Sequence, residues 1–217
     1  MQEISHIPVL ANEVLHALDP KPGQLFIDAT VGHGGHAQLI LERIIPAGRL
    51  LAFDRDANNL RIAEERLARF SNTSVFVRDS YATLTTHAYD HGFSQVDGIL
   101  LDLGFSSAHI KDRERGFSFQ TEGPLDMRYD IRQTTTAATI INEWSEEDLA
   151  RIFRQYGEER HARKIAQEII SMRSKRPFAT TTELAEFIAT LLPRRGRIHP
   201  ATLVFQALRI AVNNELE

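Results

Sequence analysis

A glycine-rich run, Gly32 to His36, lies between a stretch that predicts a strand and one that predicts a helix. At such a turn the backbone can approach a ligand closely and present the amides of a helix N-terminus to it. Gly34 and Gly35 have no Cβ, so they permit that approach and a positive φ. The run therefore predicts a loop that binds a nucleotide-like cofactor.

Two aspartates favour one class of cofactor over another. Asp54 ends the next predicted strand, 20 residues after Gly34, at the spacing of a carboxylate that binds ribose hydroxyls. Asp28 ends the first strand, where it could hold the cationic amino-acid end of S-adenosylmethionine. However, Gly32, Gly34 and Ala37 also fit the G-x-G-x-x-A pattern of dinucleotide-binding folds. The residues favour S-adenosylmethionine and leave a nicotinamide or flavin cofactor open.

Polar residues also follow two further predicted strands. Asp79 and Tyr81 come after Ser74–Val77, where an acid could reach the adenine amino group and a ring could cover the base. A tyrosine such as Tyr81, taken alone, is more often a core residue than part of a cofactor site. Asp102 follows Val96–Leu101, next to the expected place of the transferable methyl group. Because the carboxyl ends of parallel strands share one edge, these residues predict a single pocket.

The elements that must position these residues alternate along the first half of the chain. Four short apolar runs predict strands at Leu25–Ala29, Arg49–Asp54, Ser74–Val77 and Val96–Leu101. Helical patterns separate them at Ala37–Ile45, after the capping residue Asp56, and at Leu84–His91. This alternation predicts an α/β fold with a parallel, doubly wound sheet.

The second half predicts a loop-rich and helical unit. Residues 104–136 show no clear periodicity, and loops of that length are often functional. Further helices are expected from a cap at Ser145 to about Tyr156, and at Glu158–Arg173, Thr182–Leu191 and Pro200–Asn213. The last residues resemble the middle of an uncapped helix, which suggests a chain that lacks its remaining strands. We expect a cofactor-binding domain at 1–107 and a helical insertion at 108–217.

Composition bounds the function without deciding it. The 217 residues contain no cysteine, which excludes disulfides and thiolate metal sites and fits the cytoplasm. No apolar run approaches the ~18 residues that span a bilayer, and no signal peptide is evident, so no membrane association is expected. The net charge of −4 divides into −9 for residues 1–150 and +5 for 151–217. A basic face for RNA and a merely solvated surface both fit this division. His87 and His91 lack a third ligand, so they are expected at the surface and no metal site is predicted.

Short motifs along nearly the whole chain carry a resemblance to a known family. They are His6–Leu10, Val31–His36, Leu101–Gly104 with Ser106-Ser107, Arg115–Phe119, Gly123–Arg128, Tyr156–Arg160 and His199–Thr202 with Phe205–Ala207. Together they resemble the bacterial small-subunit ribosomal RNA cytosine-N4 methyltransferases. The block from Arg115 to Arg128 is far more specific than the glycine loop.

The resemblance implies a Rossmann-like methyltransferase domain interrupted by a helical insertion. It implies N4-methylation of a cytidine of 16S rRNA in the decoding region near the P site. By position, the family's cofactor contacts fall on Gly34, Gly35, His36, Asp54, Tyr81, Asp102 and His109. The family usually has Phe at Tyr81 and Gln at His109, so the second contact is in doubt. Family members also continue beyond the end of this chain.

Candidate residues for the reaction and the RNA follow from this resemblance. Asp102 is the expected catalytic residue, as an acceptor for the N–H protons of the target amine. Phe117 and Phe119 could stack on a flipped base or plug the insertion, and Arg115 and Arg128 could contact phosphates. Better candidates for phosphate contacts are the basic stretches Arg173–Arg176 and Arg194–Arg197.

The expected partner is 16S rRNA or the small ribosomal subunit, and dimerisation stays open. Two alternatives remain beside the methyltransferase. One is a nicotinamide-dependent enzyme that uses the same loop, and the other is a non-catalytic fragment that binds RNA or the ribosome.

Overall fold

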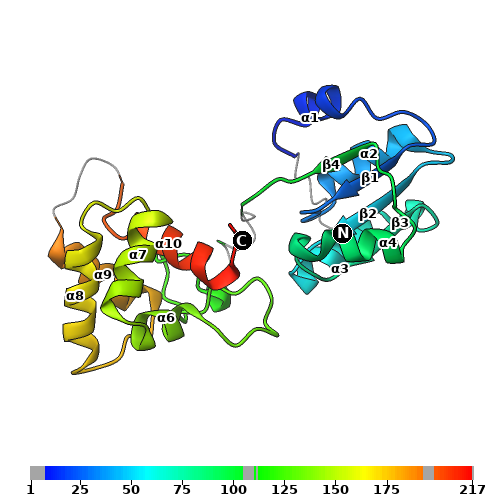
Figure 1. Ribbon diagram of the computed structural model, residues 1–217. Helices are drawn as coiled ribbons and strands as arrows, with labels where there is room; N and C mark the ends of the chain where they lie inside the picture. The colour runs from blue at the N-terminus through cyan, green and yellow to red at the C-terminus, as the bar shows by residue number, and fades with distance from the viewer. Residues whose placement is uncertain (1–7, 105–109, 111, 193–197, 217) are drawn as a thin grey trace. The chain divides into compact units, whose positions relative to one another are not determined.

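The computed structural model describes residues 8–104, 110, 112–192 and 198–216. The chain divides into two compact units, Met1–Gly104 and Phe105–Glu217 (Figure 1). Each unit has a hydrophobic core of its own.

The first unit is built on a four-stranded parallel sheet. Its strands are β1 (Leu25–Asp28), β2 (Arg49–Phe53), β3 (Ser74–Val77) and β4 (Gly98–Leu100), in the order β3-β2-β1-β4. Ile27 of β1 pairs with Leu51 of β2 and with Ile99 of β4. The order reverses between β1 and β4, which is the switch point where ligands bind in such folds. The predicted α/β, Rossmann-like fold is confirmed.

Four helices cover this sheet: α1 (Ala11–Leu18), α2 (Gly35–Ile44), α3 (Ala57–Arg66) and α4 (Leu84–Asp90). Successive strand residues face opposite sides, so Phe26 packs in one cluster with α2 and α3. Its neighbour Ile27 packs in a second cluster that includes Ala88 of α4. Both faces are therefore buried, which explains the continuous apolar runs of the strands. Helix α1 was not predicted.

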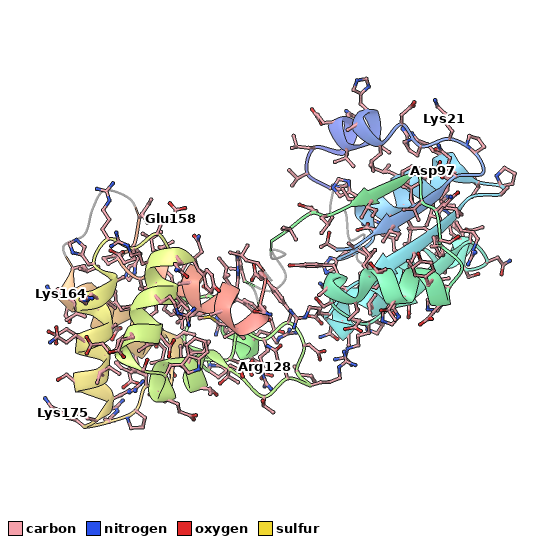
Figure 2. The ribbon with its side chains drawn as sticks, in the orientation of Figure 1. Lys21, Asp97, Arg128, Glu158, Lys164 and Lys175 are labelled. Atoms are coloured by element: carbon pink, nitrogen blue, oxygen red, sulfur yellow. The ribbon has the colours of Figure 1, made fainter. Side chains whose placement is uncertain are left out.

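In the first unit, the strand boundaries expected from the sequence differ little from those observed. Asp97, labelled in Figure 2, precedes β4 and accepts a hydrogen bond from the amide of Leu25 at 2.8 Å, which fixes the amino ends of β1 and β4. Ala29, Asp54 and Leu101 were expected inside strands but follow them. These residues therefore lie in the loops at the carboxyl ends of the strands, which carry the candidate site.

The second unit is helical, as predicted, in its described part. It contains a 3₁₀ turn at Arg113–Arg115 and the helices α6 (Ala137–Glu143), α7 (Glu146–Gln155), α8 (Ala162–Arg173), α9 (Thr181–Leu191) and α10 (Thr202–Asn213). Ser145 caps α7 by accepting from the amide of Asp148, as its sequence indicates. Helix α6 was missed, although Thr136 and Thr139 form a capping box at its start. Its seven residues are too few for a clear helical period.

The expectation of an uncapped helix at the chain end is wrong. Helix α10 ends at Asn213, and Asn214 adopts a left-handed φ of 51° and donates its amide to the carbonyl of Ile210. Asn tolerates this conformation better than most residues, so it serves as a helix terminator. Glu215 then pairs with Arg209 at 2.9 Å.

Within the described ranges, none of the helices has both the length and the apolar character needed to cross a membrane.

Candidate active site

The carboxyl ends of the four strands carry the residues that sequence analysis selected in the first unit. In spatial order, Asp79 and Tyr81 follow β3, Asp54 follows β2, the glycine loop follows β1 and Asp102 follows β4. Neighbouring strands lie about 4.8 Å apart, so the row extends over roughly 14 Å. That length suits an extended nucleoside with an amino-acid tail.

The glycine loop has the backbone geometry that its sequence predicts. Gly34 has a φ of 77°, and a Cβ there would lie 3.3 Å from the Leu67 side chain and 3.4 Å from the Ala63 Cα. Helix α2 begins at Gly35 directly behind it, and no side chain caps this helix start. Amides at an uncapped helix start seek an acceptor elsewhere. The loop can therefore offer them to a ligand.

Asp54 holds the glycine loop against β2. Its Oδ2 accepts hydrogen bonds from the Gly32 amide at 3.0 Å and from the Asn59 side chain at 3.1 Å. Its Oδ1 accepts from the Asp56 amide at 2.8 Å. Burial raises the pKa of Asp54, and these hydrogen bonds oppose the rise. A carboxylate has about four acceptor positions, so one remains for a ribose hydroxyl.

Asp28 is a buried acid at the centre of the row. Its side chain is almost fully enclosed, and the amide of Thr30 donates to its Oδ1 at 3.1 Å. Burial raises the pKa of Asp28 to about 7, and the charges of Asp54 and Asp102 add to the rise. Three carboxylates that repel one another would be relieved by a cation between them. The site therefore fits a positively charged ligand.

Asp102 and His36 lie together at the β4 end. The backbone amide of Asp102 donates to the Thr30 hydroxyl at 2.7 Å, and its side chain is 61% exposed. The Nε2 atom of buried His36 lies 3.9 Å from Oδ2 of Asp102. Burial lowers the pKa of His36, although Asp102 opposes the shift. Among the described residues, Nδ1 of His36 has no hydrogen-bond partner. The arrangement places an accessible carboxylate beside a buried ring.

Asp79 and Tyr81 lie at the β3 end. Asp79 accepts from the Ser80 amide at 2.7 Å through Oδ1 and contacts Nε2 of His87 at 3.1 Å through Oδ2. Tyr81 begins a 3₁₀ turn, Tyr81–Thr83, and is half-buried. The expected surface position of His87 is wrong, because its side chain is 28% exposed and its ring packs edge-on against Phe53. No sequence signal pairs His87 with Asp79, since only tertiary packing brings α4 beside the loop after β3.

The candidate RNA contacts of the second unit are engaged with one another in the described structure. Arg115 donates to the carbonyls of Arg128 and Tyr129 at 2.7 and 3.1 Å. Arg128 donates twice to the Asp126 carboxylate, and also to the carbonyls of Ile131 and Gln133. These contacts tie the loop after the 3₁₀ turn into a fixed shape. Direct contact with RNA stays a prediction for both arginines.

The two phenylalanines also have partners within this unit. Phe117 stacks on Tyr129 with ring centroids 5.3 Å apart, and Phe119 packs against Phe205 and His199. Stacking on a base stays a prediction for both rings. Arg173, in the first basic stretch, donates to the carbonyls of Ile141 and Trp144, both at 2.7 Å.

Some predicted site residues cannot be placed. His109 and the arginines of the second basic stretch, Arg194, Arg195 and Arg197, lie outside the described residues. Over the part of the chain that is described, no three His, Cys, Asp or Glu side chains gather as metal ligands would.

Comparison with known proteins gives consistent matches over the chain. The model of the MraW methylase family matches residues 3–217. Ribosomal RNA small subunit methyltransferase H of Nostoc sp. is 52% identical over 98% of this chain and 68% of that protein. The protein of that name from Geotalea daltonii is 48% identical over 100% of this chain and 70% of its own length.

Among solved structures, a SAM-dependent O-methyltransferase from Thermotoga maritima is 19% identical. The match covers 33% of this chain and 28% of that one, with a TM-score of 0.31. At that TM-score the likeness adds no argument to the sequence matches.

Proposed function

Because the chain belongs to the MraW methylase family, as its motifs predict, we propose that it methylates N4 of a cytidine in 16S ribosomal RNA with S-adenosylmethionine as methyl donor. The names of its relatives support methylation of small-subunit ribosomal RNA. The N4 position and the decoding region near the P site come from the family resemblance of the motifs.

The observation that carries the proposal is the row of carboxylates beside the glycine loop. Asp28 ends β1, and Asp54 and Asp102 follow the neighbouring strands β2 and β4. Burial raises the pKa of Asp28, and the charges of Asp54 and Asp102 add to the rise. S-adenosylmethionine, when bound, supplies an electrophilic methyl group on a positively charged sulfonium. Asp54 would hold its ribose, and Asp28 with the loop at Gly34 and Gly35 its amino-acid end. Asp79 and Tyr81 would hold its adenine.

The same carboxylates argue against a dinucleotide. A pyrophosphate beside the glycine loop would lie close to Asp28 and Asp102, and like charges at short distance repel. The shifts of the Asp28 pKa have no basic side chain among their causes. A nicotinamide cofactor is therefore the poorer fit to this loop.

Asp102 is the residue that we propose acts on the target amine. The cytosine amine is a weak nucleophile because its lone pair is delocalised into the ring, so alignment and removal of its proton matter most. The exposed carboxylate of Asp102 can accept an N–H hydrogen bond and take up the proton as charge builds on the nitrogen.

We further propose that residues 108–217 recognise the RNA. The net charge of +5 in residues 151–217 supports an electrostatic contribution to binding. Arg115, Phe117, Phe119 and Arg128 would then shape the RNA-facing loop, and exposed basic residues such as Lys175 would contact phosphates.

The direct test is transfer of a labelled methyl group to small ribosomal subunits and to naked 16S rRNA, both from cells lacking the modification. We expect label on one cytidine, located by nuclease digestion and mass spectrometry. Label on another base or on protein would overturn the proposal. RNA binding without transfer would identify a non-catalytic fragment, and parallel titrations with S-adenosylhomocysteine and NAD would separate the two cofactor classes.

The role of Asp102 is tested by Asp102→Asn in the same assay. Loss of one acceptor aimed at developing charge costs about 10²- to 10³-fold in turnover. We expect such a loss in turnover, with a much smaller change in cofactor affinity. Near-normal turnover in this variant would exclude Asp102 as the acceptor.

A further inference from the structure

A histidine–aspartate pair lies at the β3 end of the proposed cofactor site. Nε2 of His87, on α4, lies 3.1 Å from Oδ2 of Asp79, in the loop after β3. The side chains are 28% and 41% exposed, so the pair is half-buried but open on the Asp79 side. Neither the family resemblance nor the reaction gives His87 a role.

The surroundings of His87 fix its ring. Its centroid lies 5.7 Å from that of Phe53 at an interplanar angle of 67°, an edge-on contact. His91, which directly follows the last residue of α4, stacks on the imidazole with ring centroids 6.3 Å apart at an interplanar angle of 18°. Phe53 is fully buried and directly precedes Asp54, which is the proposed ribose contact. The imidazole therefore joins the ribose and adenine ends of the row.

The charge state of Asp79 makes the contact directional. Burial raises the pKa of Asp79, but hydrogen bonds from His87, the Ser80 amide and Thr83 outweigh it and leave this pKa below its ordinary value. Asp79 is then ionised at neutral pH and can only accept hydrogen bonds. It follows that Nε2 of His87 carries the proton of this contact.

We propose that His87 is a positioning residue that holds the Asp79 carboxylate toward the exocyclic amine of adenine and thereby selects adenine over a 6-oxopurine. This inference rests on the proposed function, since it requires an adenosyl cofactor at this edge. With Oδ1 held by the Ser80 amide and Oδ2 by His87, the carboxylate plane is fixed at two points. Its remaining acceptor positions suit an amine donor and repel the carbonyl oxygen of a 6-oxopurine.

Without His87, Asp79 would discriminate only weakly between adenine and a 6-oxopurine. A half-exposed carboxylate on a loop can turn away from a mismatched base and be hydrated instead. Because ring packing fixes the His87 donor, the Asp79 carboxylate cannot turn away. A 6-oxopurine then meets an acceptor that cannot rotate. Discrimination that depends on unpaired polar groups is strong only where those groups are held in place.

The experiment compares the Kd of S-adenosylhomocysteine with that of S-inosylhomocysteine by calorimetry, using the whole chain. His87→Phe keeps a ring against Phe53 but cannot donate, whereas His87→Gln can still donate to Asp79. We expect the preference for the adenine ligand to fall about ten-fold in His87→Phe, equivalent to one charged hydrogen bond, and to be largely restored in His87→Gln. Tyr89→Ala, which removes an exposed ring elsewhere on α4, should leave the preference unchanged.

A second comparison separates positioning from structural support. In an Asp79→Ala background, His87→Phe should change the preference no further, because the two residues act through one contact. Equal weakening of both ligands in His87→Phe, with an unchanged ratio, would overturn the inference and leave the proposed function standing. Failure of the unaltered chain to bind either ligand would overturn both.

Discussion

The amide of Gly32 donates a hydrogen bond to Oδ2 of Asp54 at 3.0 Å, so the residue expected to bind the ribose also fixes the cofactor loop. This contact joins the turn after β1 to the end of β2. It explains why an acid is suited to this position even before a ligand arrives, because two backbone amides and one side-chain amide already point at the carboxylate.

Asp54→Asn should therefore damage the loop as well as ribose binding. An asparagine presents one NH₂ group where the aspartate presents an acceptor, so at least one donor loses its partner. We expect a loss of stability of about 1–3 kcal/mol, together with at least about ten-fold weaker binding of S-adenosylhomocysteine. Urea unfolding and calorimetry measure the two effects. Asp90→Asn, an exposed acid at the end of α4, should change neither.

Gly34→Ala tests the close approach behind the loop. A left-handed conformation costs a residue with a Cβ about 1–2 kcal/mol. Gly23→Ala is the matched control, since Gly23 has a φ of 86° but nothing within 4 Å of its added Cβ. We expect Gly34→Ala to destabilise the chain more than Gly23→Ala, because Leu67 and Ala63 crowd its added Cβ. Of the two variants, only Gly34→Ala should also weaken cofactor binding. Equal effects on stability would show that crowding at Gly34 is relieved by small shifts.

Asp28 should make the ligand-free chain less stable as the pH rises. Its pKa is about 7 in the folded chain, against an ordinary value of 3.8, so the folded state binds the proton more tightly. Stability then falls between about pH 4 and pH 7 and levels off above, by roughly 4 kcal/mol at most. Asp28→Asn keeps an acceptor for the Thr30 amide and should remove this component.

The measurement is urea unfolding from pH 5 to 8, with circular dichroism as the signal. The free energy of unfolding of Asp28→Asn, relative to that of the unaltered chain, should increase with pH. Parallel pH profiles for the two proteins would contradict the raised pKa. Saturating S-adenosylmethionine should reduce the difference, since its positive charge relieves the carboxylates.

The parts of the fold that follow from local pattern were predictable. Four apolar runs bounded by turns predicted β1 to β4, and Asp56 and Ser145 predicted helix starts that the structure confirms. The end of the last helix at Asn213 was predicted, but its cap was missed because a left-handed residue at Asn214 leaves the apolar period of α10 intact up to its last turn.

The site was predictable only as far as strand ends and family motifs reach. Asp28, Asp54 and Asp102 were predictable from their places at the ends of three strands. The contact of His87 with Asp79 does not, because it depends on how α4 packs against Phe53. Nor do the partners of Arg128, which lie in a loop without periodicity.

Two basic residues of the second unit should separate RNA contact from structural support. Figure 2 labels both Arg128 and Lys175. Arg128 pairs with Asp126 at 2.7 Å and reaches two carbonyls, whereas Lys175 is exposed just after α8. Arg128→Gln should destabilise the chain by about 1–3 kcal/mol, since it leaves a half-buried carboxylate without its charged partner.

Lys175→Gln should instead leave stability unchanged and weaken RNA binding. If Lys175 contacts one phosphate, its loss reduces the slope of log Kd against log salt by about 0.7–0.9. Filter binding of small-subunit RNA at about 50 to 200 mM salt measures this slope. An unchanged slope for Lys175→Gln, together with a reduced slope for a folded Arg128→Gln, would place the RNA at the Arg115–Arg128 loop instead.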